Sequence, residues 1–208
     1  MKKGKIAFFA TGNVHKFHEA RAVLREFGIS TAMLRLKAKE IQADEIDLIA
    51  KTSAQETATK SRIPIFVEDA GLFIKALNGF PGPYSSYVYR TLGTKGILKL
   101  MKNIRTRGAN FQSVAAFCDS DEPNSLRCFA GKANGQIALK ERGRLGFGFD
   151  PIFEPLAEPN RSFAEMTREE KNRHSHRAQA LTQFGEWYSR TYVRLRFSKQ
   201  EKKEGRGR

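Results

Sequence analysis

Apolar positions near the start of the chain follow two spacings in turn, which predicts a strand followed by a helix. Residues 5–10, KIAFFA, are a continuous apolar run typical of a buried strand. From Val14 to Phe27 the apolar residues recur at helical spacing, and Gly28 is expected to end that helix. The chain therefore opens with a strand that passes through a short turn into a helix.

The next apolar runs predict that this alternation continues. Strands are expected over residues 31–36 and 63–68, with a helix in the acidic segment between them. Asp44 is a candidate cap for that helix, and Asp47 suits its first turn. An order of strand, helix, strand, helix, strand predicts α/β layers with at least part of the sheet parallel.

The second half of the chain has a different pattern of predicted elements. Residues 110–139 read as two or three strands joined by turns such as 121–124, which predicts antiparallel hairpins that extend the sheet. Ser85 or Ser86 is a candidate cap for a helix through residues 87–101. A closing helix is expected from about Ser175 to Tyr192. The fold class expected is α/β, with a central mixed sheet flanked by helices.

Length and composition limit the classes of protein to which the chain can belong. The 208 residues, 40% of them hydrophobic, suffice for one domain or two small lobes. No apolar run approaches the roughly 20 residues that span a bilayer, so a cytoplasmic protein is expected. Cys118 and Cys128 have no second pair and no neighbouring histidine, which indicates small strand residues and not a disulfide framework or zinc site.

The formal charge of +15 is the unusual global feature. It favours a phosphate or polyanion as partner, and a solvated basic surface is the alternative explanation. Residues 197–208 are basic and almost free of apolar side chains, so we expect a disordered tail after a domain of residues 1–196. The remaining cations do not form a run beside clustered aromatic residues, so a dedicated nucleic-acid groove is not favoured.

The first chemical candidate is the turn Thr11-Gly12-Asn13 between the first strand and the first helix. Free backbone N–H groups and the positive end of the helix dipole meet there, which favours phosphate. Lys16, one turn later, is a candidate for a further positive charge. The alternative is that Asn13 merely caps the helix and Lys16 faces solvent.

The second candidate is the pair Glu68 and Asp69, which follows the third expected strand. Ligands of open α/β sheets lie beyond the carboxyl ends of the strands, and successive side chains point to opposite faces unless a glycine such as Gly71 turns the backbone. Mg²⁺ takes one or two carboxylates plus phosphate oxygens and waters. Glu40 and Asp69 are therefore a candidate metal pair. The alternative is that the two acids cap a following helix.

Two later segments carry further candidates. Residues 145–150, LGFGFD, present phenylalanine faces that suit stacking on a nucleobase, although core packing is the commoner use of such residues. Thr167 with Glu170 forms a capping-box pattern, and Ser175 is a candidate helix cap. Cations in a first helical turn are disfavoured by the dipole, so recognition of an acceptor-bearing ligand is one reason to find them there. The candidates are His176 and Arg177, with Lys171 nearby, and a plain surface helix start is the alternative.

Six blocks follow one another in the chain: TGNVHK, EIQ, VEDAGLFIKALNGFPGPYSS, FGFDPIF, FAEMTREEKN and SHRAQAL. In this order they resemble the inosine triphosphate pyrophosphatase family, its archaeal members most, over roughly residues 5 to 190. The resemblance implies a two-lobed, inosine-triphosphatase-like (Maf/Ham-like) architecture. It also implies hydrolysis of ITP, dITP and XTP to the monophosphate and pyrophosphate by a Mg²⁺-dependent homodimer, which keeps these nucleotides out of DNA and RNA.

The resemblance also implies a role for each matching residue. It assigns binding of the triphosphate to Thr11, Gly12, Asn13 and Lys16, with Ala70 beside it. Glu40 and Asp69 hold the metal, and Asp69 is also the general base for the attacking water. The purine is bound by Phe147, Gly148, Phe149 and Asp150, with Phe149 stacking, and is read by Lys171, His176 and Arg177.

Two departures from the family pattern stand out. Ala70 replaces the usual serine or threonine after the acid pair and removes a hydroxyl near the phosphates. Phe149 replaces the commoner tyrosine, keeping a stacking face and losing a hydrogen bond. The alternative functions are a pyrophosphatase for another damaged or pyrimidine nucleotide, and a basic nucleic-acid-binding protein.

Overall fold

A computed structural model of the chain describes residues 5–36, 41–122 and 125–192. Its centre is a seven-stranded mixed sheet in the order β2-β1-β3-β5-β6-β7, with β4 paired to β3 beside that path. The strands are β1 (Lys5–Ala10), β2 (Ile29–Leu34), β3 (Ile65–Ile74), β4 (Pro81–Gly82), β5 (Gly108–Cys118), β6 (Arg127–Ile137) and β7 (Phe153–Pro155). Among the strands in these ranges, β1 pairs in parallel with β2 and with β3, and the other pairs are antiparallel.

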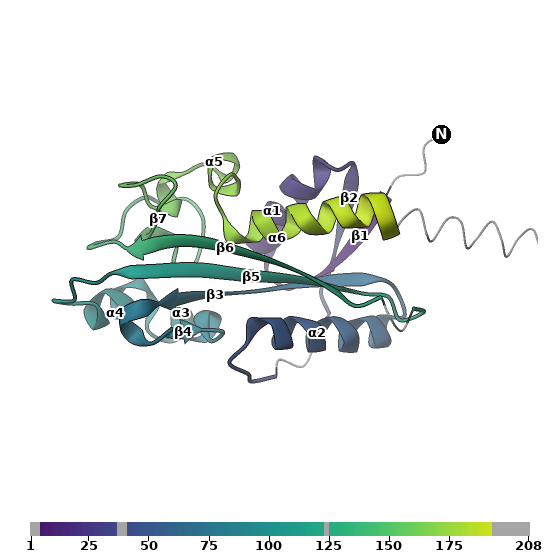
Figure 1. Cartoon of the computed structure of the whole chain (residues 1–208), viewed down its shortest axis with the longest axis horizontal. Helices are drawn as coiled ribbons and strands as arrows, with labels where there is room; N and C mark the ends of the chain where they lie inside the picture. The colour runs from purple at the N-terminus through teal and green to yellow at the C-terminus, as the bar shows by residue number, and fades with distance from the viewer. Residues whose placement is uncertain (1–4, 37–40, 123–124, 193–208) are drawn as a thin grey trace, which may run out of the picture.

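Helices cover both faces of this sheet (Figure 1). They are α1 (Val14–Arg25), α2 (Ile46–Ser61), α3 (Ser85–Thr91), α4 (Gly93–Leu100), α5 (Arg168–Asn172) and α6 (His176–Trp187), joined by 3-10 turns η1 (Lys75–Leu77), η2 (Asp150–Ile152) and η3 (Phe163–Glu165) and a π turn η4 (Tyr188–Tyr192). The expectation of a mixed sheet flanked by helices is confirmed. No helix in the described ranges is long and apolar enough to cross a membrane.

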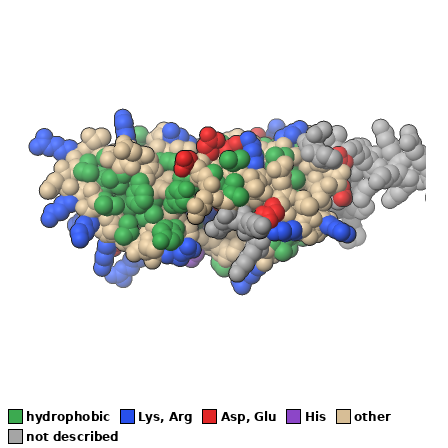
Figure 2. Space-filling view, turned by 90° about the horizontal axis from the view of Figure 1, so that it is seen from below, with side chains coloured by type: hydrophobic (Ala, Val, Ile, Leu, Met, Phe, Trp, Pro, Cys, Tyr) green, Lys and Arg blue, Asp and Glu red, His purple; other side chains and the backbone are tan. Residues whose placement is uncertain are grey.

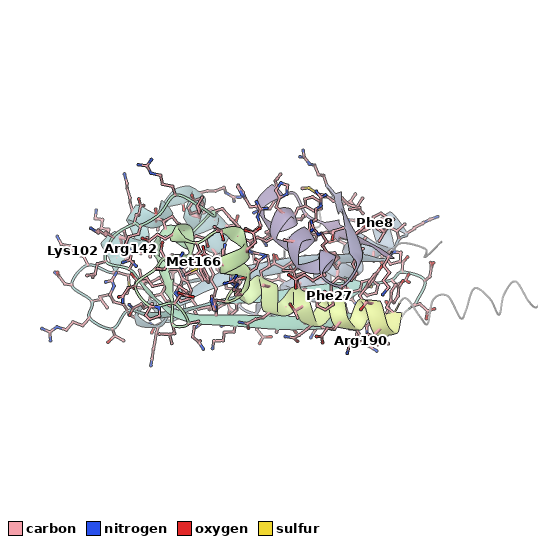
Figure 3. All side chains as sticks on the ribbon, turned by 90° about the horizontal axis from the view of Figure 1, so that it is seen from above. Phe8, Phe27, Lys102, Arg142, Met166 and Arg190 are labelled. Atoms are coloured by element: carbon pink, nitrogen blue, oxygen red, sulfur yellow. The ribbon has the colours of Figure 1, made fainter. Side chains whose placement is uncertain are left out.

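The core consists of three apolar clusters that follow these layers. One lies between the sheet and helices α1 and α6 and includes Phe66 and Phe184, and a second lies between the opposite face and α2. A third fills the far end of the sheet, under α3, α4 and η3. Helix α6 also packs closely against the end of α1, where Phe27 lies against Gly185 (Figure 3).

Strand β3 is longer than the sequence pattern predicts. It does not end at Glu68 but runs on to Ile74, because residues 65–74 pair continuously with β5. The two acids therefore lie inside a strand, just beyond its short parallel contact with β1 at Ile65 and Phe66. Neither acid caps a helix, so that alternative is wrong as well.

The segment after β3 also differs from its predicted form. No turn occurs at Gly71; its missing side chain makes room for the Gly82 carbonyl oxygen, which a Cβ would overlap. Ser85 does not cap a helix, since its hydroxyl accepts from Leu72 N and donates to Gly82 O. One expected helix over residues 87–101 is two, α3 and α4, which meet at Gly93 with a positive φ of 63°.

Other local predictions have mixed outcomes. The hairpin of β5 and β6 is confirmed, with Cys118 and Cys128 half-buried in its strands, while residues 123–124 of its turn lie outside the described ranges. Strand β2 begins two residues earlier than expected. Asp44 does not cap α2, which begins after Glu45 without a side-chain cap. The tail over residues 197–208 lies outside the described residues.

Candidate active site

One cleft brings together residues far apart in the chain. It has a volume of about 1330 Å³ and lies between the β1–α1 turn, β3, α3 and the starts of α2, η2 and α6. It is lined by every candidate site residue that the structure describes: Thr11, Gly12, Asn13, Lys16, Asp69, Ala70, Phe147, Gly148, Phe149, Asp150, Lys171, His176 and Arg177. Glu40 lies outside the described residues.

The β1–α1 turn combines a cap with open amides. Asn13 Oδ1 accepts from the amides of His15 and Lys16 at 2.9 and 3.1 Å, so the cap interpretation is confirmed. Within the described residues, the amides of Gly12 and Val14 form no hydrogen bond. No atom lies within 4 Å of where a Gly12 Cβ would stand. The turn can therefore still bind an anion through these two amides.

Lys16 does not face solvent, so that alternative is wrong. Its Nζ donates to the backbone oxygen of Glu68 at 2.9 Å and lies 3.0 Å from the Glu68 carboxylate. The lysine side chain keeps 19% of its surface exposed, toward the cleft. It is thus held at the edge of the site by the strand that carries the acid pair.

Glu68 and Asp69 lie on opposite faces of β3, as strand geometry requires. Glu68 alternates with Phe66, which packs under α1 and α6, whereas Asp69 alternates with Val67, which packs against α2. Asp69 is half-buried and lines the cleft. The two acids are therefore available for different tasks.

Glu68 is completely buried between two cations and one hydroxyl group. Its partners are Lys16, Arg177 Nε at 3.1 Å and the Ser113 hydroxyl at 2.5 Å. Burial alone would raise the pKa of this carboxyl, but the charges of Arg177 and Lys16 and the Ser113 hydrogen bond lower the pKa well below its ordinary value. Glu68 is therefore ionised throughout the physiological range.

Sequence reasoning missed Glu19, a second buried acid on α1. It accepts from Lys171 Nζ at 2.8 Å and from Arg177 at 2.6 Å. Burial would raise its pKa, but these two cations lower the pKa from 4.5 to about 2. The available signal was position, because Glu19 shares the buried face of the helix with Val23, four residues on.

The two cations at the base end are buried, so the plain surface helix start is wrong for this segment. Arg177 and Lys171 are 3% and 2% exposed. Arg177 is tolerated in the first turn of α6 because Glu19 and Glu68 both pair with it. Lys171 Nζ also donates to Asp150 at 2.6 Å, and burial raises the pKa of Asp150. Each cation retains N–H groups beyond those used here.

His176 differs from the adjacent Arg177 in charge. It is 2% exposed and stacked on Phe111, and burial together with the charge of Arg177 lowers its pKa well below 6.5. It is therefore neutral at pH 7 and makes no conflict with the helix dipole. The caps around these residues are as predicted, with Ser175 on Ala178 N and a capping box between Thr167 and Glu170.

The two phenylalanines of residues 145–150 have different surroundings. Phe149 is 3% exposed and contacts the edge of Tyr89, with ring centroids 5.5 Å apart. Phe147 is half-buried, stacks on His15 at 5.1 Å, and has Lys171 Nζ 4.9 Å from its ring centroid. The face of Phe147 is thus already covered by cationic and aromatic groups that a base would have to join or displace.

The carboxylates fit a shared divalent cation and not a protein-only metal cage. In the described part of the chain, no three His, Cys, Asp or Glu side chains are grouped to hold a metal. Of the three carboxylates Glu68, Asp69 and Asp150 in the cleft lining, Glu68 and Asp150 are buried, whereas Asp69 is half-buried and so the one whose exposure suits a cation. Mg²⁺ fits such a site because it accepts one or two carboxylates with phosphate and water oxygens.

Known proteins resemble the chain in sequence and in fold. The family model described as the Ham1 family matches residues 7–187. A "dITP/XTP pyrophosphatase" of Methanopyrus kandleri is 48% identical over 86% of this chain and 94% of its own, and one of Thermococcus kodakarensis is 46% identical over 86% and 95%. A solved HAM1 protein from Coxiella burnetii is 28% identical, with a TM-score of 0.74 over 87% of this chain and 96% of its own. This chain belongs to the Ham1 family.

Proposed function

We propose that this protein hydrolyses non-standard purine nucleoside triphosphates, namely ITP, dITP and XTP, to the monophosphate and pyrophosphate. The names of its relatives support the reaction. The observation that carries the proposal is one cleft with open helix-start amides at one end and two buried cations, Lys171 and Arg177, at the other. Such a cleft suits a ligand with phosphates at one end and an acceptor-bearing base at the other.

At the phosphate end, the amides of Gly12 and Val14 and the Lys16 ammonium bind the triphosphate. Thr11 and Asn13 keep the turn in shape through their own hydrogen bonds. The backbone N–H of Ala70 remains in the family position, although its side chain offers no hydroxyl. Fixed donors of this kind stabilise charge that develops on phosphate oxygens during transfer.

Asp69 takes the proton from the water that attacks the α-phosphorus, and pyrophosphate leaves. Mg²⁺, when bound with Glu40, Asp69 and the phosphates, offsets negative charge on them. Glu68 cannot replace Asp69 as base, because it is fully buried and held by Lys16, Arg177 and Ser113. Two adjacent acids thus have separate roles, one in positioning and one in proton transfer.

At the base end, selectivity follows from the donors. Hypoxanthine and xanthine carry an acceptor oxygen at position 6, where adenine carries an amino donor. The remaining N–H groups of Lys171 and Arg177 pair with the oxygen and would be left unpaired by adenine, which costs about 1–3 kcal/mol per buried donor. Guanine shares the oxygen, so its 2-amino group or the pocket shape must exclude it.

The direct test is pyrophosphate release from ITP, dITP, XTP, GTP, ATP and dUTP, with and without Mg²⁺. We expect release from the first three to depend on the metal and to exceed release from ATP by about ten-fold or more, the equivalent of 1.4 kcal/mol. Preferential cleavage of dUTP would instead assign the protein to pyrimidine nucleotides. No release from any of the six would contradict the proposed reaction.

A homodimer in the cytoplasm completes the proposal. Figure 2 shows hydrophobic side chains gathered over α3 and α4, where Tyr87, Leu92 and Leu100 expose 61%, 49% and 47% of their surface. A second copy would cover them. Light scattering should give about twice the 23.5 kDa chain mass, and Leu92→Glu should halve it. A wild-type mass of one chain at every concentration would contradict the dimer.

A further inference from the structure

Glu68 contacts residues of both ends of the cleft. Its Oε2 lies 3.0 Å from Lys16 Nζ, at the phosphate end. Its Oε1 lies 3.1 Å from Arg177 Nε, at the base end, and accepts from the Ser113 hydroxyl at 2.5 Å. The carboxylate has no exposed surface and Lys16 keeps only 19% of its side chain exposed, so water screens these contacts less than it screens ion pairs at the protein surface.

The two cations therefore share one buried negative charge. A phosphate that binds Lys16 competes with Glu68 for the ammonium and weakens the contact between them. The carboxylate is then held more by Arg177, and the guanidinium loses freedom before a base arrives. A ligand that meets a preordered group has less conformational entropy to remove, which raises its affinity.

Resting on the function proposed above, we infer that Glu68 is a positioning residue that couples the two ends of the cleft. Phosphate at Lys16 strengthens the hold of Glu68 on Arg177, so that the base is read mainly when the phosphates are in place. Glu19 cannot provide this link, because its partners Lys171 and Arg177 both lie at the base end. Free nucleosides and bases would then compete weakly with a triphosphate.

Two ligands that represent the separate ends test the coupling. Calorimetry measures the Kd of inosine, which has no charge, with and without saturating pyrophosphate in a buffer containing Mg²⁺. Because inosine is neutral, direct repulsion or attraction between the ligands is small. We expect pyrophosphate to tighten inosine binding by about five-fold or more in the wild type.

Three variants locate the coupling. Glu68→Gln keeps the shape and removes the charge, and Glu68→Asp keeps the charge but is one methylene too short to reach both cations. In both variants, pyrophosphate should leave the Kd of inosine nearly unchanged instead of lowering it five-fold. If the glutamine variant does not fold, the aspartate variant alone tests the role of Glu68. Ser113→Ala is the matched control, since it leaves both ion pairs in place and should keep the coupling.

The outcomes separate the two proposals. If wild-type protein binds neither inosine nor pyrophosphate, the proposed function itself fails. If both bind but inosine affinity is unchanged or weakened by pyrophosphate, only the coupling fails. Coupling that persists in Glu68→Gln or Glu68→Asp would overturn the assignment to Glu68.

Discussion

Replacing Asp69 by asparagine is expected to abolish turnover of dITP and XTP while the protein stays folded. The amide cannot accept the proton of the attacking water and is a poor ligand for Mg²⁺, so kcat should fall by about a thousand-fold or more. The fold should survive because Asp69 lies on the α2 face of β3, whereas the buried ion pairs of Glu68 lie on the other face.

The measurement is pyrophosphate release, with thermal unfolding as a check on the fold. Asp47→Asn is a matched control, because it makes the same chemical change outside the cleft, in the first turn of α2, where the Asp47 side chain is half-buried and pairs with Lys51. That variant should keep full activity. An Asp69→Asn protein with near-normal kcat would remove Asp69 from the mechanism.

The second large effect concerns stability in acid. The pKa of Glu19 falls from 4.5 to about 2 on folding, so this carboxylate stabilises the protein fully above pH 4.5, and the contribution is lost as the pH falls toward 2. At 1.36 kcal/mol per pKa unit the contribution is about 3 kcal/mol. Glu68 contributes to stability with the same pH dependence, since folding also lowers its pKa.

Glu19→Gln should therefore be less stable at pH 7 by about 3 kcal/mol, and its stability should fall less steeply than that of the wild type between pH 4.5 and 2. Urea unfolding at several pH values measures both effects. Glu26→Gln, at an exposed position just after the same helix, should follow the wild type. Parallel profiles for Glu19→Gln and wild type would contradict the stabilising role of this acid.

Local features of the fold were predictable because local chemistry decides them. Asn13 and Ser175 cap their helices as their residue types favour, and apolar spacing located β1 and α6. The extension of β3 was not predictable in this way. It depends on pairing with β5, some 40 residues later, and an aspartate in a strand contradicts local propensity.

The same distinction between local and long-range effects applies to the candidate site. Motif resemblance identified residues that one cleft brings together, but not the arrangement of their charges. The pairing of Glu19 with Lys171 and Arg177 joins residues more than 150 positions apart, which periodicity in a helix cannot reveal. Nor does composition indicate that Phe149 is enclosed while Phe147 lies under Lys171.

The buried ion pairs also bear on how products leave. Three cations, Lys16, Lys171 and Arg177, are matched by three carboxylates, Glu19, Glu68 and Asp150. Buried cations without a carboxylate partner would retain pyrophosphate, a strongly anionic product, and slow each cycle. Each of these cations can pair with its carboxylate again when the phosphates leave. Product release therefore leaves no buried charge without a partner. The same balance that holds the empty cleft together therefore favours rapid clearance of the enzyme for the next nucleotide.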